Sequence, residues 1–168
     1  RLLALAAVEH QQQLVSPQRL DLTTLIAQVA SDQATRLSAR QQRLALDVGA
    51  PVFVIGDAFL LRQAIGNLVE NAASFAPAGS VIDLDLQIAQ EHALLRVRDR
   101  GPGIPDYARA RVFDRFYSLP RPEGGERSSG LGLCFVAEVA ALHGGSARLD
   151  NAPEGGACAS LRLPLAPD

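Results

Sequence analysis

The sequence has no lysine, and all sixteen basic residues among its 168 are arginines. This absence excludes a Walker-type phosphate-binding loop, because that motif uses a lysine to reach the phosphates. Cysteine is scarce as well: Cys134 and Cys158 stand far apart, with no Cys-x-x-Cys spacing. The two cysteines therefore indicate neither a zinc site nor a disulfide framework, and free thiols favour a reducing, cytoplasmic setting.

An excess of charge of one sign and long apolar runs are also missing. The formal net charge is only −2, with acidic and basic residues mixed, so we expect no nucleic-acid partner. The longest apolar run, at residues 2–8, is far shorter than a membrane span and lacks the organisation of a signal peptide. Because 48% of the residues are apolar, the chain can bury one core, and we expect a single globular domain.

Residues 60–75 carry two adjacent rows of side chains at helical spacing. The first row is apolar and predicts a buried face: Leu61, Ile65, Leu68, Ala72 and Phe75. The second row is polar, and its members Asn67 and Asn71 lie one turn apart, between Gln63 and Ser74. Burying an amide without a partner costs roughly 1 to 3 kcal/mol, so these two amides are expected to hold a ligand, a metal or the backbone.

The rest of the pattern predicts helices and strands interleaved along the chain. Residues 1–13 have the pattern of the end of a longer helix, and further helices are expected at 23–41, 131–143 and, as a short piece, 107–116. Strands are expected at 20–22, 43–48, 52–55, 81–89, 93–99, 146–151 and 157–163. Two hairpins are expected, 81–89 with 93–99 and 146–151 with 157–163, and a turn at 49–51 joins 43–48 to 52–55. The expected fold is α+β: a two-layer sandwich with helices on one face of a mixed, mostly antiparallel sheet.

One glycine-rich segment follows a predicted strand, and a second opens a predicted helix. Asp99 extends the inward row of the strand at 93–99, and the Gly-Pro-Gly turn at 101–103 permits close approach of a ligand to the backbone. An isolated Asp-x-Gly is nevertheless more often a simple capped turn. The segment Gly130-Leu131-Gly132-Leu133 opens the last helix, where free backbone amides suit a phosphate. Neither glycine pair has the spacing of a dinucleotide-binding fingerprint.

The order of these motifs resembles that of the sensor histidine kinases. Residues 67–72 (NLVENA) are similar to the N box of that family, 99–104 (DRGPGI) to its first glycine box, 112–117 (VFDRFY) to its F box and 130–133 (GLGL) to its second glycine box. The resemblance covers about 20–163 and implies the Bergerat ATP-binding fold shared with gyrase, Hsp90 and MutL-type ATPases. Residues 116–122 (FYSLPRP) more narrowly resemble CreC-type sensor kinases.

The resemblance implies ATP and Mg²⁺ as ligands and gives roles to individual residues. Asn71 would bind Mg²⁺ through its amide oxygen, Asn67 would lie on the same helix face at the phosphates, and both would serve catalysis. Asp99 would accept a hydrogen bond from the adenine amino group. The other nucleotide-site residues would be Gly101, Gly103 and Ile104 around adenine, and Gly130, Leu131, Gly132 and Leu133 at the phosphates. Residues 118–129 would form a mobile ATP lid, with Phe116 anchoring its base.

The sequence departs from the family pattern at three positions. Ser74 stands where the family often has a lysine or arginine that contacts a phosphate, and we expect Arg115 or Arg127 to substitute for that charge. Arg100 replaces an asparagine that is usual in the first glycine box, and Ser128 stands where a glycine often opens the second. Neither of the last two changes removes a proposed ligand.

The resemblance also implies partners. Residues 1–16 would be the end of a dimerisation and phosphoacceptor helix, and 17–168 the catalytic domain. The activity would be transfer of the γ-phosphoryl group of ATP to a histidine on that dimerisation domain, since His10 is followed by glutamine and lacks the His-Glu or His-Asp pattern of a phosphoacceptor. We expect a monomeric fragment, a response regulator as partner, and a homodimeric parent in the inner membrane whose catalytic domain is cytoplasmic.

Two other functions stay open at this point. A Bergerat-fold ATPase or a serine kinase of the anti-sigma type would share the nucleotide pocket, but the F box and the helix at residues 1–13 argue against it. A nucleotide-binding or interaction module without catalysis is the second alternative, and Ser74 is the residue that favours it.

Overall fold

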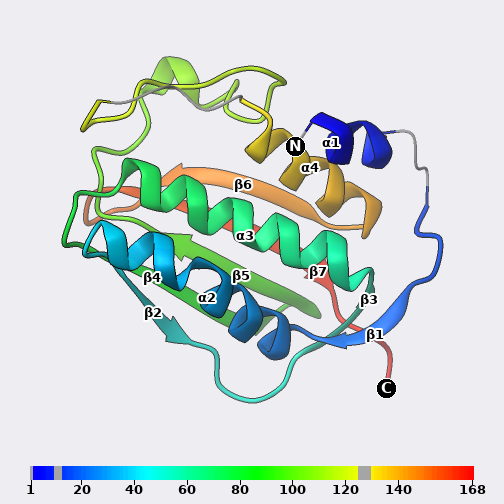
Figure 1. Cartoon of the computed structure of the whole chain (residues 1–168). Helices are drawn as coiled ribbons and strands as arrows, with labels where there is room; N and C mark the ends of the chain where they lie inside the picture. The colour runs from blue at the N-terminus through cyan, green and yellow to red at the C-terminus, as the bar shows by residue number, and fades with distance from the viewer. Residues whose placement is uncertain (1, 10–12, 125–129) are drawn as a thin grey trace.

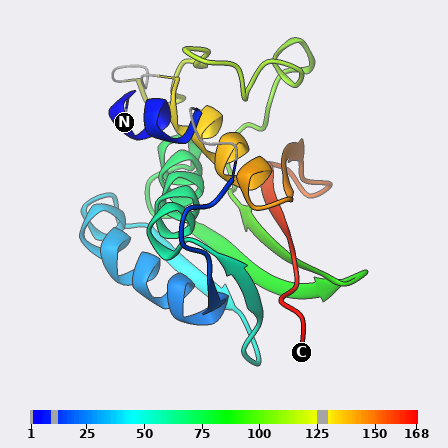
Figure 2. The ribbon, with the colours of Figure 1, turned by 90° about the vertical axis from the view of Figure 1, so that its right-hand side faces the viewer.

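Helices cover one face of a sheet in a two-layer arrangement, as Figures 1 and 2 show. The structure is a computed structural model and describes residues 2–9, 13–124 and 130–168. Over these residues the main sheet has five strands in the order β2-β4-β5-β7-β6, and β2 and β4 form its single parallel pair. The predicted α+β sandwich is therefore confirmed.

The elements end within a few residues of the predicted limits, with one exception. The helices are α1 (Leu2–Glu9), α2 (Leu22–Ala39), α3 (Ala58–Phe75) and α4 (Gly132–Leu142). The strands are β1 (Gln18–Asp21), β2 (Arg43–Asp47), β3 (Phe53–Gly56), β4 (Val81–Ala89), β5 (His92–Arg98), β6 (Ser146–Asn151) and β7 (Ala157–Pro164). The exception is the helix predicted at 107–116, where the structure has only the 3-10 turn η1 (Asp106–Ala108) followed by further turns.

Strands β2 and β3 are consecutive in the chain but belong to different sheets. The turn at 49–51 does not fold them into a hairpin: β2 pairs with β4 in parallel, and β3 pairs antiparallel with β1 in a separate two-stranded sheet. Leu44 lies beside Ile82 in the first pair, and Leu20 lies beside Val54 in the second. Turn residues indicate a change of direction, whereas the partner of each strand is set by distant apolar residues that the turn does not encode.

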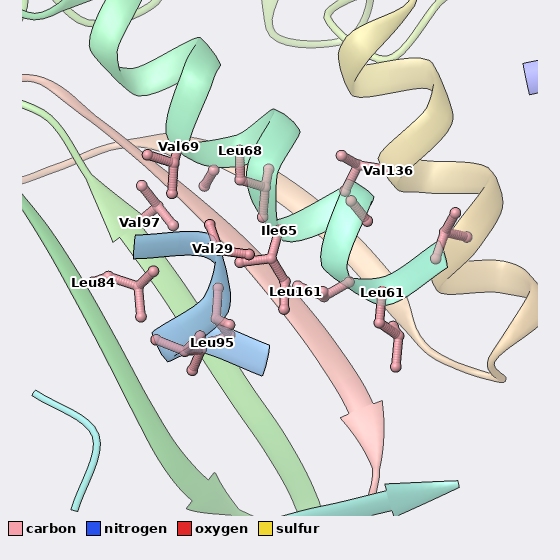
Figure 3. Close-up of a cluster of buried hydrophobic side chains, with 14 of the residues drawn as sticks. Val29, Leu61, Ile65, Leu68, Val69, Leu84, Leu95, Val97, Val136 and Leu161 are labelled. Atoms are coloured by element: carbon pink, nitrogen blue, oxygen red, sulfur yellow. The ribbon is translucent and has the colours of Figure 1, made fainter. Parts of the chain in front are cut away.

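Helix α3 lies at the centre of the core, between α2, α4 and the sheet (Figure 3). Its apolar row faces side chains from all three, and in the figure Leu61, Ile65 and Leu68 point toward the strands. These three residues are at most 1% exposed, and full burial of each contributes about 1.5 to 3 kcal/mol. Because this packing fixes the rotation of α3 about its axis, it also fixes the direction of the polar row beside it.

Side chains hold both ends of α3. Asp57, directly before the helix, caps its first turn, since its Oδ1 accepts from the Leu60 N–H at 2.9 Å. At the other end, the side-chain amide of Gln42 donates to the carbonyls of Ala73 and Ala76, at 3.0 and 3.2 Å. The guanidinium of Arg40 donates to the same two carbonyls. The last carbonyls of the helix therefore have partners although the helix ends inside the protein.

Helix α1 packs against α4 through Leu5 and Val8, both nearly fully buried, and Figure 1 shows the two helices next to each other. Of the helix predicted at 1–13, residues 2–9 are helical, residue 13 lies in a bend, and residues 1 and 10–12 lie outside the described part. Whether 1–16 belongs to a separate dimerisation domain stays a prediction. None of the described helices is both long enough and apolar enough to cross a membrane.

Candidate functional site

A cavity of about 260 Å³ lies beside the polar row of α3 and the start of α4. Eight of the thirteen residues predicted to serve the site line it: Asn67, Asn71, Asp99, Gly103, Ile104, Gly130, Gly132 and Leu133. These residues come from α3, from the loop after β5 and from the start of α4, which are far apart in sequence. The fold therefore brings the N box and both glycine boxes to one cavity.

Asp99 follows directly after β5 and is 3% exposed. Its Oδ1 accepts from the Gly101 N–H at 2.8 Å and from the Ala157 N–H at 3.2 Å. Within the described part of the chain, Oδ2 receives no hydrogen bond, and the residue lines the cavity. Burial raises the pKa of this carboxyl above its ordinary value, although the two backbone hydrogen bonds act in the opposite direction. One oxygen of a buried carboxylate is thus left to accept from a ligand.

The loop after Asp99 is held close to α3 by glycine. A Cβ placed on Gly101 would lie 2.4 Å from the carbonyl oxygen of Phe75, so any side chain there would push the loop away from the helix. Asn151 at the end of β6 fixes the next part of the loop, since its Oδ1 accepts from the Ile104 N–H at 2.6 Å and its Nδ2 donates to the Ile104 carbonyl at 3.0 Å. Sequence reasoning did not find Asn151, whose only signal was an amide at the end of a predicted strand.

The two asparagines of α3 have different surroundings. Asn67 is 7% exposed, and its Nδ2 donates to the Gly132 carbonyl at 3.1 Å, which ties α3 to the start of α4. Asn71 is half-buried and lines the cavity, and the Ser74 hydroxyl donates to its backbone carbonyl at 2.9 Å. The side chain of Asn71 makes no hydrogen bond to another described residue, so its oxygen is available to a ligand.

The start of α4 forms another part of the cavity wall. No side chain of the described residues caps this helix, so the amides of its first turn have the polarity that favours an anion. Gly132 and Leu133 line the cavity, whereas Leu131 is 4% exposed and belongs to the core. Gly130 has a positive φ of 74° and packs against the backbone of Phe116, where a side chain would not fit.

The segment predicted as a lid is described up to residue 124. It crosses from the F box toward the C-terminal end of α3, where Glu123 accepts from the Ala78 N–H at 2.9 Å and pairs with Arg40 at 2.9 Å. Arg121 lines the cavity, lies 4.2 Å from the centre of the Phe75 ring and donates to the Leu119 carbonyl at 2.8 Å. Burial lowers the pKa of the Arg121 guanidinium below its ordinary value. Phe75, predicted to be a core residue, is half-buried and lines the cavity instead, because α3 ends there.

The other predicted residues that the structure describes do not line the cavity. Arg115 forms an ion pair with Glu9 of α1, and Phe116 is 62% exposed with a φ of 66°. Gly101 lies behind Asp99, to which its amide donates. Arg127 and Ser128 fall outside the described residues, and Arg100 pairs with Asp83 at 3.0 Å. Arg115 and Arg127 as phosphate ligands therefore stay predictions.

The donors at the cavity fit Mg²⁺ better than a transition metal. Among the described residues no group of three or more histidine, cysteine, aspartate or glutamate side chains could hold a metal ion. The amide oxygens of Asn67 and Asn71 are hard ligands, and Mg²⁺ is commonly held by one or two protein oxygens together with water and substrate phosphates.

Comparison with known proteins gives the same family as the motifs. Residues 56–167 match the family described as histidine kinase-, DNA gyrase B- and HSP90-like ATPases. The chain is 45% identical over 163 residues to the sensor protein CreC of Escherichia coli, which covers 96% of this chain and 34% of that protein. It is 40% identical over 142 residues to the histidine-protein kinase/phosphatase MprB of Mycolicibacterium vanbaalenii, covering 80% of this chain and 28% of that protein. The chain thus spans about a third or less of these relatives.

Solved structures agree with this fold. A mycobacterial sensor histidine kinase MprB has a TM-score of 0.78 at 34% identity, covering 91% of this chain and all of that one. Full-length ShkA in complex with AMPPNP has a TM-score of 0.83 at 28% identity, covering 99% of this chain and 35% of that one. On the fold, the cavity and these matches, the chain belongs to the family of histidine kinase-, DNA gyrase B- and HSP90-like ATPases, and its relatives there include sensor kinases such as CreC.

Proposed function

We propose that this chain binds ATP with Mg²⁺ and is the catalytic domain of a sensor histidine kinase. The observation that carries the proposal is that one cavity is lined by two kinds of polar group. One is the buried carboxylate of Asp99, whose Oδ2 receives no hydrogen bond from the described residues, and the other is formed by the amides of Asn67 and Asn71 with the start of α4. An adenine amino group and a triphosphate with its cation have the complementary chemistry.

Each wall of the cavity would contribute one part of the binding. Asp99 would accept from the adenine amino group, and the apolar side chains of Ile104 and Val112 would exclude water around the base. Asn71 would hold Mg²⁺ through its amide oxygen, while Asn67 keeps α3 and the start of α4 in register beside it. The first-turn amides of α4 would face the phosphates. ATP supplies the phosphoryl group, and these residues position it and neutralise its charge.

The acceptor and the partners follow from the relatives. CreC is named a sensor protein, PmrB a sensor protein kinase and SasA a sensory kinase, and the names of AfsQ2 and MprB include histidine-protein kinase. We infer that the acceptor histidine lies on a dimerisation domain of the parent, that the parent is a homodimer in the inner membrane with this domain in the cytoplasm, and that a response regulator receives the phosphoryl group. The names of the relatives give no support to a serine kinase or to a module without catalysis.

Radiolabelled ATP tests the proposed transfer. The full-length parent incubated with γ-labelled ATP and Mg²⁺ is expected to gain an acid-labile label on histidine, because the acceptor is then present. The 168-residue chain alone is expected to stay unlabelled. Asn71→Ala in the parent should lower the labelling rate roughly 100-fold or more, since it removes the proposed cation ligand. Label on the isolated chain, or on a serine of the parent, would contradict the proposal.

A further inference from the structure

A cationic side chain of α2 enters the cavity beside the polar row of α3. Arg36 lines the cavity together with Asn71 and Ser74. Its guanidinium lies 3.0 Å from Oε1 of Glu70, the residue directly before Asn71. The contact joins two different helices, and no sequence motif includes Arg36. Its position in the cavity therefore depends on how α2 packs along α3.

The pair between Arg36 and Glu70 is asymmetric. The Glu70 side chain is only 20% exposed and also accepts from the Gln33 amide at 3.5 Å, so α2 holds this carboxylate from two positions. The Arg36 side chain is 56% exposed. Because an exposed ion pair contributes little to stability, the guanidinium can exchange Glu70 for a ligand with more negative charge.

The positive charges around the cavity leave a role for the Arg36 side chain. Two arginines line the cavity in the described part of the chain, Arg36 and Arg121. Arg121 is stacked on Phe75 and donates to a carbonyl of its own segment, whereas Arg36 approaches from the side of Asn71. At Ser74, on the same face of α3, the side chain carries no charge. A triphosphate held near Asn71 would meet the positive charge of Arg36, whereas α3 itself offers no positive charge at Ser74.

We propose that Arg36 binds the phosphates of ATP and supplies the positive charge absent at Ser74. This inference rests on the proposed function. Arg36 exchanges the Glu70 carboxylate for phosphate oxygens when the nucleotide enters, and a guanidinium suits these oxygens because it can donate two parallel hydrogen bonds. The phosphate site is thus completed by α2, outside the four sequence boxes.

Nucleotide titration of variants tests the assignment. Arg36→Ala is expected to bind AMPPNP with Mg²⁺ about ten-fold more weakly than the wild type, and adenosine within about two-fold of it, because only phosphates contact Arg36. Arg62→Ala is the matched control: Arg62 also pairs across α2 and α3, with Asp32 at 2.7 Å, but does not line this cavity. The control should bind both ligands like the wild type.

A second variant separates charge from packing. In the Arg36→Ala background, Ser74→Lys is expected to recover most of the lost AMPPNP affinity, because it returns a cation to the same part of the cavity. Wild-type binding of AMPPNP by Arg36→Ala, or an equal loss for adenosine and AMPPNP, would overturn the assignment of Arg36 alone. A wild-type chain that binds no nucleotide at millimolar concentration would overturn the proposed function, and this inference with it.

Discussion

The burial of Asp99 costs stability and fits the role in binding that is proposed for it. Burial raises its pKa, so keeping this carboxylate ionised in the folded protein costs free energy. Its Oδ1 is fully used by two backbone amides, and Oδ2 has no donor among the described residues. A residue kept only for a capped turn would gain nothing from this burial, whereas an acceptor for a ligand needs it.

Asp99→Asn is therefore expected to make the folded chain more stable at pH 7 than the wild type. The amide oxygen can still accept from Gly101 and Ala157, and the desolvated charge is removed. Because the folded pKa of Asp99 lies above the ordinary 3.8, the stability that Asp99 contributes is complete below that value and is lost as pH rises through the folded pKa. Thermal unfolding followed from pH 7 down to 4.5 should show the advantage of the variant shrinking.

A purely structural Asp99 would give the opposite result. In that case the substitution would lower stability at pH 7 by roughly 1 to 3 kcal/mol, as the loss of a buried charged acceptor does. Equal thermal midpoints at every pH would also contradict the account, because they would mean that burial of the carboxylate has no consequence.

The sequence predicted the cavity residues that belong to a motif and missed those that reach the cavity through tertiary packing. Asn71, Asp99 and Gly132 were found because their spacing within motifs is characteristic. Arg36 was not found, since its segment reads as ordinary helix surface and it reaches the cavity only through contacts with α3. Arg121 lies in the segment predicted as the lid, but no motif gave it a role of its own.

Among the elements, α3 carries the polar row of the site, and the end of α4 holds the start of α3 in place. His143, at the end of α4, accepts from the Asp57 N–H through Nε2 at 3.0 Å, so its proton lies on Nδ1, which donates to the Val139 carbonyl at 2.7 Å. Gly56 leaves room for the ring, since a Cβ there would lie 2.5 Å from it. This neutral histidine joins the N-terminus of α3 to the C-terminus of α4 across the core.

Protonation of His143 should loosen that junction. Burial lowers its pKa below the ordinary 6.5, and the hydrogen bond to the Val139 carbonyl and the charge of Asp57 only partly offset this. The stability that it contributes is therefore complete above pH 6.5 and is lost as pH falls through the folded pKa, with a slope of at most about 1.4 kcal/mol per pH unit. Urea unfolding of the wild type and of His143→Gln between pH 7.5 and 5 should show a pH slope that the variant lacks.

His92→Gln is the matched control, because His92 lies at the β4–β5 turn and bonds only locally and to Arg162. This variant should keep the slope of the wild type. A slope that survives in His143→Gln, or disappears in His92→Gln, would show that the pH dependence arises elsewhere.

At the scale of whole elements, periodicity predicted what each segment is but not always what it pairs with. The limits of β4 and β6 were predicted to the residue, since alternating side chains and turn residues define both ends. The separation of β2 from β3 was not predicted, because their partners, β4 and β1, are chosen by apolar contacts far apart in sequence. The irregular course of 109–116 was not predicted either, since a helix was expected there although few of its side chains repeat at any period.

Considered as a whole, the molecule places its ligand site at one edge of the core. The sheet and the three long helices form one apolar body, and the cavity opens where α3 ends and the F-box segment passes over it. A second, smaller cluster of Ile104, Ala108, Val112 and Ala157 lies under that segment. The F-box segment, which would cover the ligand, thus packs on a small cluster of its own beside the main core. This arrangement suits a site whose cover moves during binding.

Calorimetric titration with AMPPNP, with and without Mg²⁺, in the wild type and Asp99→Asn, tests the central claim most directly. The account predicts saturable binding by the wild type that weakens without Mg²⁺, and binding by Asp99→Asn at least roughly 100-fold weaker although the variant stays folded. Absence of wild-type binding at millimolar nucleotide, or wild-type affinity in Asp99→Asn, would contradict it.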